Sequence, residues 1–212
     1  MKHLIVLAHP RRESFTRRVC DTYIEAVLAL GHEVLLRDLY EMQFNPVADA
    51  EEGRTRPGAP PAPDVQIEMD HLLAADVVAF VSPVWWIAPP ALMKGWLDRV
   101  LRGGGFAYGH GPTGPRGALV GKRSLVLTSA GSTVDEFERT GKLAAIRVMW
   151  GVGTVEFCGM QLLEHLHFGP VGSRSSPEMI NGYLERVRLA VRLHFATHAP
   201  AAASDPTAGR GH

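Results

Sequence analysis

The chain has 212 residues, of which 46% are hydrophobic, and it carries 22 acidic and 22 basic side chains. This length suits one domain with a sizeable core, and the balanced charge gives no overall field directed at nucleic acid or a membrane surface. No apolar run approaches the roughly 20 residues that cross a bilayer, and the first apolar run is not preceded by a signal peptide. We therefore expect a cytoplasmic protein without a membrane span or a nucleic-acid partner.

Short apolar runs alternate along the chain with segments of helical periodicity. Strands are predicted at about 3–8, 33–37, 76–81 and 124–128, with a fifth beginning near 154–157. Helices are predicted at about 15–30, 65–74, 90–102, 134–149 and 177–195. The first run has no polar interruption, which is typical of a strand covered on both faces. Ser175 or Ser176 is the expected cap of the last helix, because Pro177 suits its first turn.

Two segments are too rich in turn formers to be regular elements. Residues 53–64 hold proline and glycine throughout and predict a surface loop, and glycines at 103–105, 109, 111 and 114 predict a long mobile loop over 103–117. The α/β alternation continues across both, so residues 1–198 are predicted to form a single domain. Residues 199–212, rich in Ala, Gly, Pro and Ser, are predicted to be a disordered tail.

The two cysteines predict no disulfide. Cys20 lies in a predicted helix and Cys158 in a predicted strand, so both are expected to be small buried apolar groups. This usage fits a reducing compartment.

Five strands alternating with helices predict a parallel sheet with right-handed crossovers. The Gly-x-Gly-x-x-Gly signature of a Rossmann fold is absent from the first turn. We therefore predict the α/β flavodoxin-like fold, a five-stranded parallel sheet of order 2-1-3-4-5 with helices on both faces. This order places the loops after the first and third strands side by side, where ligands bind in open sheets.

The first of these loops, residues 8–15, carries small polar and basic groups at a helix start. A helix N-terminus presents unpaired N–H groups to an anion, and Arg17 or Arg12 would complete the charge. A simpler interpretation is that Ser14 only caps the helix and the arginines are solvated. His9 is either a core histidine or a ligand contact.

The second loop places two tryptophans next to each other. Trp85 and Trp86 follow Pro83 in a loop, where large aromatic side chains need an explanation. They suit either a flat aromatic ligand or a subunit interface, and both hold if the site lies at a dimer interface. Trp96, on the following helix, is expected in the core or at that interface.

The third loop, Thr128 to Ser132, consists of small residues that let the backbone approach a planar ligand. No Cys-x-x-Cys pair accompanies the histidines, and His165 and His167 have only the i, i+2 spacing of a strand. We predict no metal site. A Gly-x-Ser-x-Gly nucleophile elbow is also absent, which argues against an α/β-hydrolase.

Several segments together resemble one protein family. Ala8-His9-Pro10 to Ser14-Phe15, the Pro83 to Val100 stretch, Gly105-Phe106-Ala107-Tyr108 and Phe157-Cys158-Gly159 occur in an order and spacing similar to those of the flavodoxin-like NAD(P)H:quinone oxidoreductases, small bacterial members included. The likeness covers about residues 1–195. It implies a homodimer that binds FMN, with FAD as the alternative. It further implies a ping-pong transfer of two electrons from NAD(P)H, the co-substrate, to a small-molecule acceptor such as a quinone, an azo dye or a nitroaromatic.

The resemblance also implies a role for each matching position. The phosphate end of the flavin would be held by His9, Ser14, Phe15, Thr16 and Arg17; the ring by Pro83, Val84, Trp85, Trp86 and Ile87; and its other edge by Thr128, Ser129, Ala130 and Gly131. Phe106 and Tyr108, contributed by the partner subunit, would cover the acceptor pocket.

The chain departs from this family at one place. Members carry a Tyr and a His after the third loop, where this chain has Glu136 and Lys142. Lys142, Arg139 or the N–H groups of Ala130 and Gly131 are the candidates to stabilise charge on the reduced ring. The departure keeps open an accessory or regulatory flavoprotein that binds a partner such as a transporter, with weak turnover. An electron-transfer flavodoxin is a third alternative, and the neutral charge counts against it.

Overall fold

The computed structural model describes residues 1–50, 52, 60–112 and 114–196. Its centre is a parallel sheet of five strands: β1 (Lys2–Leu7), β2 (Glu33–Asp38), β3 (Val77–Pro83), β6 (Arg123–Ser129) and β7 (Gln161–Phe168). The strand order is β2-β1-β3-β6-β7, which is the predicted order 2-1-3-4-5. The predicted tail 199–212 and most of the proline-rich segment 53–64 lie outside the described residues.

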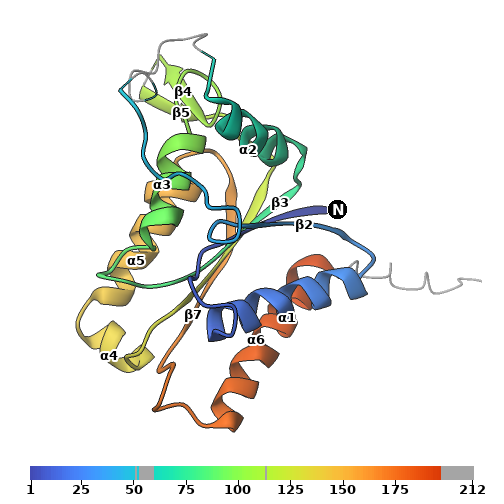
Figure 1. The fold of residues 1–212 in the computed structure, drawn as a ribbon, viewed down its shortest axis with the longest axis vertical. Coiled ribbons are helices and arrows are strands. Elements are labelled where there is room, and N and C mark those ends of the chain that lie inside the picture. The colour runs from blue at the N-terminus through green and yellow to red at the C-terminus, as the bar shows by residue number, and fades with distance from the viewer. Residues whose placement is uncertain (51, 53–59, 113, 197–212) are drawn as a thin grey trace, which may run out of the picture.

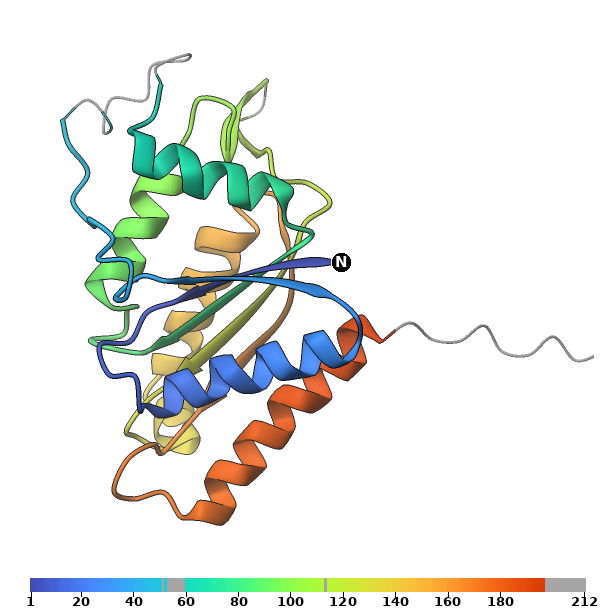
Figure 2. The same cartoon turned by 45° about the vertical axis from the view of Figure 1, so that its right-hand side comes forward.

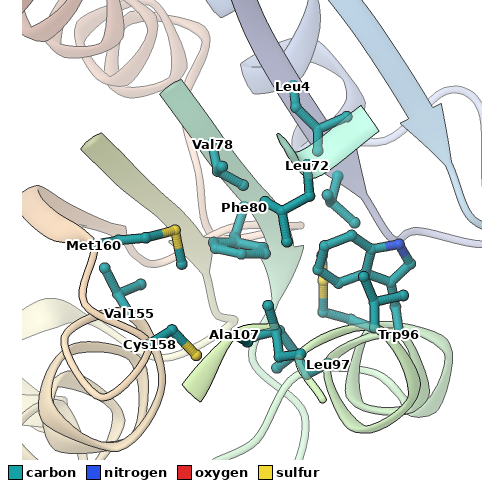
Figure 3. Packing of buried hydrophobic residues seen from close by; sticks show 14 of the residues in the cluster. Leu4, Leu72, Val78, Phe80, Trp96, Leu97, Ala107, Val155, Cys158 and Met160 are labelled. Atoms are coloured by element: carbon teal, nitrogen blue, oxygen red, sulfur yellow. The ribbon is translucent and has the colours of Figure 1, made fainter. Parts of the chain in front are cut away.

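Helices cover both faces of the sheet (Figures 1 and 2). α1 (Phe15–Ala29) and α6 (Pro177–Phe195) pack side by side on one face, and α2 (Pro63–Ala74), α3 (Ala91–Val100) and α5 (Lys142–Trp150) lie on the other. Each face buries its own apolar cluster. Figure 3 shows the cluster on the face covered by α2, α3 and α5, where Phe80 of β3 lies among side chains of α2, α3 and the segment 155–160.

The central strand β3 and the helix α3 after it are anchored by buried side chains. Every residue of β3 is buried, as expected of a strand covered on both faces. Trp96 is fully buried, and its Nε1 donates to Glu68 of α2, which also accepts from Arg37 of β2. Gly95 lets the loop at Pro46 cross α3, since a Cβ there would lie 2.3 Å from Pro46 Cβ. These contacts hold α3 firmly behind the loop that precedes it.

Two predicted helix starts are confirmed by their caps. Ser14 Oγ accepts from the N–H of Arg17 at 3.1 Å, and Ser176 Oγ accepts from the N–H of Met179 at 3.2 Å. In the part of the chain that the structure describes, no helix has the length and apolar character needed to cross a membrane.

The prediction was wrong between residues 134 and 160. The expected helix 134–149 is two helices, α4 (Val134–Arg139) and α5, because Gly141 adopts a left-handed φ of 74° between them. The expected strand at 154–157 is a π-helical turn, η1 (Gly151–Val155), and the last strand begins only at Gln161. Cys158 is therefore in a turn, although it is buried as predicted. Both cysteines are free.

The glycine-rich segment 103–117 is more ordered than predicted. It contains a two-stranded antiparallel hairpin, β4 (Tyr108–Gly111) and β5 (Gly114–Gly117). Gly117 packs against the backbone of Gly159, where a Cβ would lie 2.1 Å from the nitrogen. The hairpin is thereby fixed beside the turn that contains Cys158.

Candidate functional site

Three loops meet at the carboxyl end of the sheet and enclose a cavity of about 170 Å³. They follow β1, β3 and β6, the neighbouring central strands. The cavity is lined by His9, Arg11, Ser14, Phe15, Thr16, Pro83, Val84, Trp85, Ser129, Ala130, Gly131 and Val171. We call it the edge pocket. Its place at the switch point of the strand order is where an open α/β sheet binds ligands.

The first loop contributes the N-terminus of α1. Because Ser14 Oγ already accepts from the N–H of Arg17, that N–H is occupied, and the earlier first-turn N–H groups remain directed at the pocket. Arg11 adds a positive charge to the lining. Burial lowers the pKa of His9, so its ring is neutral at pH 7. This wall suits an anionic group such as a phosphate.

The second loop contributes a strained two-residue turn. The N–H of Trp85 donates to Ala88 O at 2.8 Å and the N–H of Ala88 donates to Trp85 O at 3.0 Å. The residues between them, Trp86 and Ile87, have left-handed φ angles of 53° and 60°. Side chains avoid this conformation, and a β-branched residue most of all. Such strain is concentrated at functional sites.

The third loop ties the other two together. Ser129 O accepts from the N–H of Val84 at 2.7 Å, and Ser129 Oγ lies 3.3 Å from Thr16 Oγ1. The N–H of Ala130 donates to Phe168 O at 2.9 Å, so it is unavailable to a ligand. Of the two backbone donors expected from sequence, Gly131 is therefore the one that remains a candidate.

Four of the predicted binding residues do not line the edge pocket. Trp86 is 99% exposed, and Ile87 packs behind the loop with Phe137 and Ala130. The Thr128 side chain faces away from the pocket, into hydrogen bonds with two histidines of β7. The roles proposed for these side chains stay predictions.

Arg17 is the fourth predicted binding residue that does not line the edge pocket, because its guanidinium binds two carboxylates. Its Nε donates to Asp21 at 2.8 Å and its Nη1 to Asp38 at 3.3 Å. It lines a second cavity of about 310 Å³, beside the ends of β1 and β2, which shares His9 and Arg11 with the edge pocket. Arg11 is therefore the arginine that the structure brings to the edge pocket.

Phe106 and Tyr108 lie at a different place from the edge pocket. Tyr108 lines a hollow of about 310 Å³ between α3 and the segment 149–158, and its ring packs on Phe157 at 5.0 Å. This hollow and the edge pocket have no lining residue in common among the described residues. Within one chain, the two aromatic residues do not cover the edge pocket.

The candidates for stabilising charge also differ in their surroundings. Lys142 Nζ lies 3.3 Å from Glu136 Oε1 and 5.7 Å from the centre of the Phe137 ring, so its charge is paired. Arg139 is exposed on α4. Sequence reasoning missed Arg174, whose guanidinium donates to Gly131 O. It also missed Val171, which lines the pocket from the segment after β7, because nothing in the sequence places that segment beside the third loop.

Comparisons with known proteins agree with this geometry. A family model described as a flavodoxin-like fold matches residues 1–190. The chain is 36% identical over 172 residues to an uncharacterized NAD(P)H oxidoreductase of Haemophilus influenzae, covering 81% of this chain and 85% of that protein. It is 34% identical over 187 residues to NAD(P)H dehydrogenase (quinone) 1 of Rattus norvegicus, covering 76% of this chain and 66% of the rat protein. Among solved structures, an NAD(P)H:quinone oxidoreductase from Methanothermobacter marburgensis superposes with a TM-score of 0.83 at 30% identity, covering 93% of this chain and 99% of that one.

Proposed function

The chain belongs to the flavodoxin-like family and is similar to NAD(P)H:quinone oxidoreductases, and from this we propose that it is a flavin-dependent NAD(P)H oxidoreductase. The acceptor would be a quinone or a related azo or nitroaromatic compound, reduced by two electrons in a ping-pong sequence. The observation that carries the proposal is the edge pocket itself, where an anion-binding helix start and an aromatic wall face each other at the switch point.

The residues of the pocket fit a flavin mononucleotide. Its phosphate would lie at the start of α1, near Ser14 and Thr16, with Arg11 supplying charge. The ring would lie between Trp85 and the small residues of the third loop, whose backbone is close enough to contact a planar group. FAD is the alternative, and the second cavity beside Arg17 offers room for a larger cofactor.

A bound flavin supplies hydride chemistry, taking two electrons from NAD(P)H and passing them to the acceptor. The protein's own part is to orient the ring, exclude water from one face and stabilise negative charge at the far edge. The Gly131 N–H is the backbone donor in position for that edge, and Arg174 fixes the same peptide by binding Gly131 O. Lys142 would contribute less, since Glu136 already neutralises it.

We propose that two copies of the chain assemble into a homodimer. Val148 and Val152 are 61% and 65% exposed on α5 and η1, whose residues Met149 and Gly153 line the same hollow as Tyr108. A second copy packed here would bury this apolar surface. Sedimentation analysis tests this, because Val152→Glu is expected to shift the protein toward the monomer while leaving its fold unchanged.

Absorption spectroscopy is the direct test of the proposed function. The purified protein is expected to retain, or to take up, FMN and to show the visible bands of an oxidised flavin. NADPH or NADH added under nitrogen should bleach these bands, and a quinone such as menadione should restore them. A colourless protein that neither FMN nor FAD reconstitutes would contradict the proposal.

A second candidate function is favoured by the Glu136–Lys142 ion pair. Because this pair occupies the places where related enzymes carry a Tyr and a His, the chain lacks their charge-stabilising groups. An accessory flavoprotein that binds a partner protein would bind FMN yet turn over weakly. Rapid bleaching by NADPH followed by rapid reoxidation by menadione would exclude it.

The chain has features that suit an intracellular reducing environment. Cys20 and Cys158 are both buried and free, and burial raises the pKa of Cys158 to about 11. Thiols kept in this state are usual in the cytoplasm, and we place the protein there, as a single flavin-binding domain over residues 1–198.

A further inference from the structure

A buried hydroxyl joins two histidines directly beneath the third loop. Thr128, at the end of β6, is 1% exposed, and its Oγ1 lies 2.8 Å from His165 Nε2 and 2.9 Å from His167 Nδ1. Both histidines belong to the neighbouring strand β7, two residues apart on one face. We call these three residues the Thr128 unit. The next residue along the chain, Ser129, already lines the edge pocket.

The two hydrogen bonds of the unit are coupled in direction. A threonine hydroxyl donates one hydrogen bond, and a neutral imidazole has one donor and one acceptor nitrogen. Burial lowers the pKa of His165 to about 3 and that of His167 to about 4, so both rings are neutral at pH 7. Thr128 therefore donates to one ring and accepts from the other. Because the contacts use Nε2 of His165 and Nδ1 of His167, the two rings must hold the same tautomer, both protonated at Nδ1 or both at Nε2, and neither can change its tautomer without the other.

The outer ends of the unit carry unmet polar atoms. His165 Nδ1 and His167 Nε2 are buried without a hydrogen-bond partner among the described residues. An unsatisfied buried polar atom destabilises the folded state, and replacement of both rings by apolar side chains would remove that cost. Folding stability therefore gives no reason for the two histidines, and a role at the adjacent site does.

The unit is connected to both walls of the edge pocket. The ring of His167 packs on Phe137 at 4.6 Å, and Phe137 belongs to a small apolar cluster with Leu143 and Ile146. Val84 of the second loop and Ala130 of the third loop pack against this same cluster. A change in the position of the His167 ring would therefore alter the spacing between the loops that face each other across the pocket.

We propose that the hydroxyl of Thr128, held between His165 and His167, positions the third loop and the Phe137 wall behind it, and so sets the affinity and reduction potential of the flavin. Thr128 and His167 are positioning residues, because neither side chain lines the pocket. This inference rests on the proposed function, since it assigns the unit to the flavin site.

Two substitutions at one position test the proposal. Thr128→Val keeps the shape and removes the hydroxyl, and Thr128→Ser restores the hydroxyl without the methyl group. Tyr23→Phe is the matched control, because it removes a buried hydroxyl that lies 2.7 Å from His3 Nδ1 at the opposite end of the sheet. The readouts are the FMN dissociation constant, the midpoint potential, and hydrogen exchange of the Ala130 amide, which donates to Phe168 O, in the flavin-free protein.

We expect Thr128→Val to raise the FMN dissociation constant about tenfold, to shift the midpoint potential, and to speed exchange at Ala130 selectively. Thr128→Ser should stay within about twofold of the original protein, and Tyr23→Phe should leave all three readouts unchanged. Wild-type affinity, potential and exchange in Thr128→Val would overturn the positioning role, as would faster exchange spread evenly over the sheet. If the unaltered protein binds no flavin, the proposed function fails by that result alone, and selective exchange at the third loop still decides whether the unit positions it.

Discussion

Buried histidines occur at both ends of the central sheet, and their hydrogen bonding differs between the two ends. At the amino end, His3 is 1% exposed, with Nδ1 2.7 Å from the Tyr23 hydroxyl and Nε2 3.1 Å from His32 Nδ1. At the carboxyl end, His167 is 4% exposed, and among the described residues its one hydrogen-bond partner is Thr128 and its Nε2 has none. Packing and hydrogen bonding alone account for the first histidine. The second needs another reason, and it lies beside the edge pocket.

The cavities follow the same division. The amino end has a hollow of about 220 Å³ whose lining includes Lys2, His3, Glu33 and His71. Its size exceeds that of the edge pocket, but it lies at the amino ends of β1 and β2, and Lys2 in its lining is partnered with Glu33. Open parallel sheets bind ligands outside the carboxyl ends of their strands, at the switch point of the strand order, and the edge pocket lies at that place. Cavity size alone is therefore a poor guide to the site.

The largest expected effect is acid destabilisation, and it divides between the two ends. Burial lowers the pKa of His3 and His165 to about 3 and that of His167 to about 4, whereas the unfolded value is about 6.5. The unfolded chain binds these protons first, so the stability that the neutral rings contribute is complete above pH 6.5. It is lost as the pH falls toward 4, at up to about tenfold in the unfolding constant per pH unit for each ring.

Urea unfolding between pH 7 and 5 measures this effect before most carboxylates titrate. His3→Gln should remove the contribution of the amino end, and His167→Gln should remove the contribution of His167 at the carboxyl end while that of His165 remains. Equal slopes in all three proteins would show that the buried rings do not take up protons on unfolding. Flavin affinity should fall in His167→Gln and persist in His3→Gln.

Trp85→Ala tests, through FMN binding, whether the carboxyl end of the sheet is the ligand-binding end. The ring of Trp85 is 42% exposed and lines the pocket, so its loss should weaken FMN binding by about 10- to 100-fold. The free energy of unfolding should change little, because a half-exposed side chain contributes little to the core. Titration of the flavin-free protein with FMN measures the first quantity and urea unfolding the second. Unchanged FMN affinity would remove Trp85 from the ring site.

Arg11 and Arg17 separate charge that binds a ligand from charge that supports the fold. Arg11→Gln should weaken FMN about tenfold and leave riboflavin, which has no phosphate, unaffected. Arg17→Gln should leave both affinities within about twofold and lower stability by about 1 kcal/mol or less, because it removes contacts with Asp21 and Asp38. A selective loss of FMN over riboflavin in Arg17→Gln would instead assign the phosphate to Arg17.

Much of the fold follows from the sequence because its central strands are unambiguous. β1 and β3 are apolar runs with short connections to helices, and they fix the strand order and the place of two of the loops. β7 is different, because it is an edge strand that carries Glu164, His165 and His167 among its apolar residues. Its mixed pattern does not indicate a strand, whereas the turn at 154–157 alternates polar and apolar residues as a strand does.

The candidate site was predictable for backbone position and not for side-chain direction. A sequence shows which loops follow which strands, and ten of the lining residues are among those that the family resemblance implies for the flavin. It does not show that Thr128 faces β7 or that Arg17 reaches the end of β2, since both depend on side chains that meet only after folding. Val171 and Arg174 were missed for the same reason.

The smallest expected effect concerns turns, which the two ends of the sheet also build differently. At the amino end, the turn from α1 to β2 places Gly31 at φ 76°, where glycine is at ease. At the carboxyl end, Trp86 holds φ 53° although its side chain is 99% exposed. Trp86→Gly should therefore be more stable than Trp86→Ala by about 1 kcal/mol, and Gly31→Ala should lose about the same amount, since a Cβ there meets nothing within 4 Å. Urea unfolding of the three variants measures these differences.

Because both Trp86 variants lose the indole ring, they should weaken self-association equally if a second copy covers it, so the backbone strain and the interface contribution are obtained separately. Equal stability of Trp86→Gly and Trp86→Ala would mean that the turn stores no strain, and the contrast between the two ends would then lie in the histidines alone.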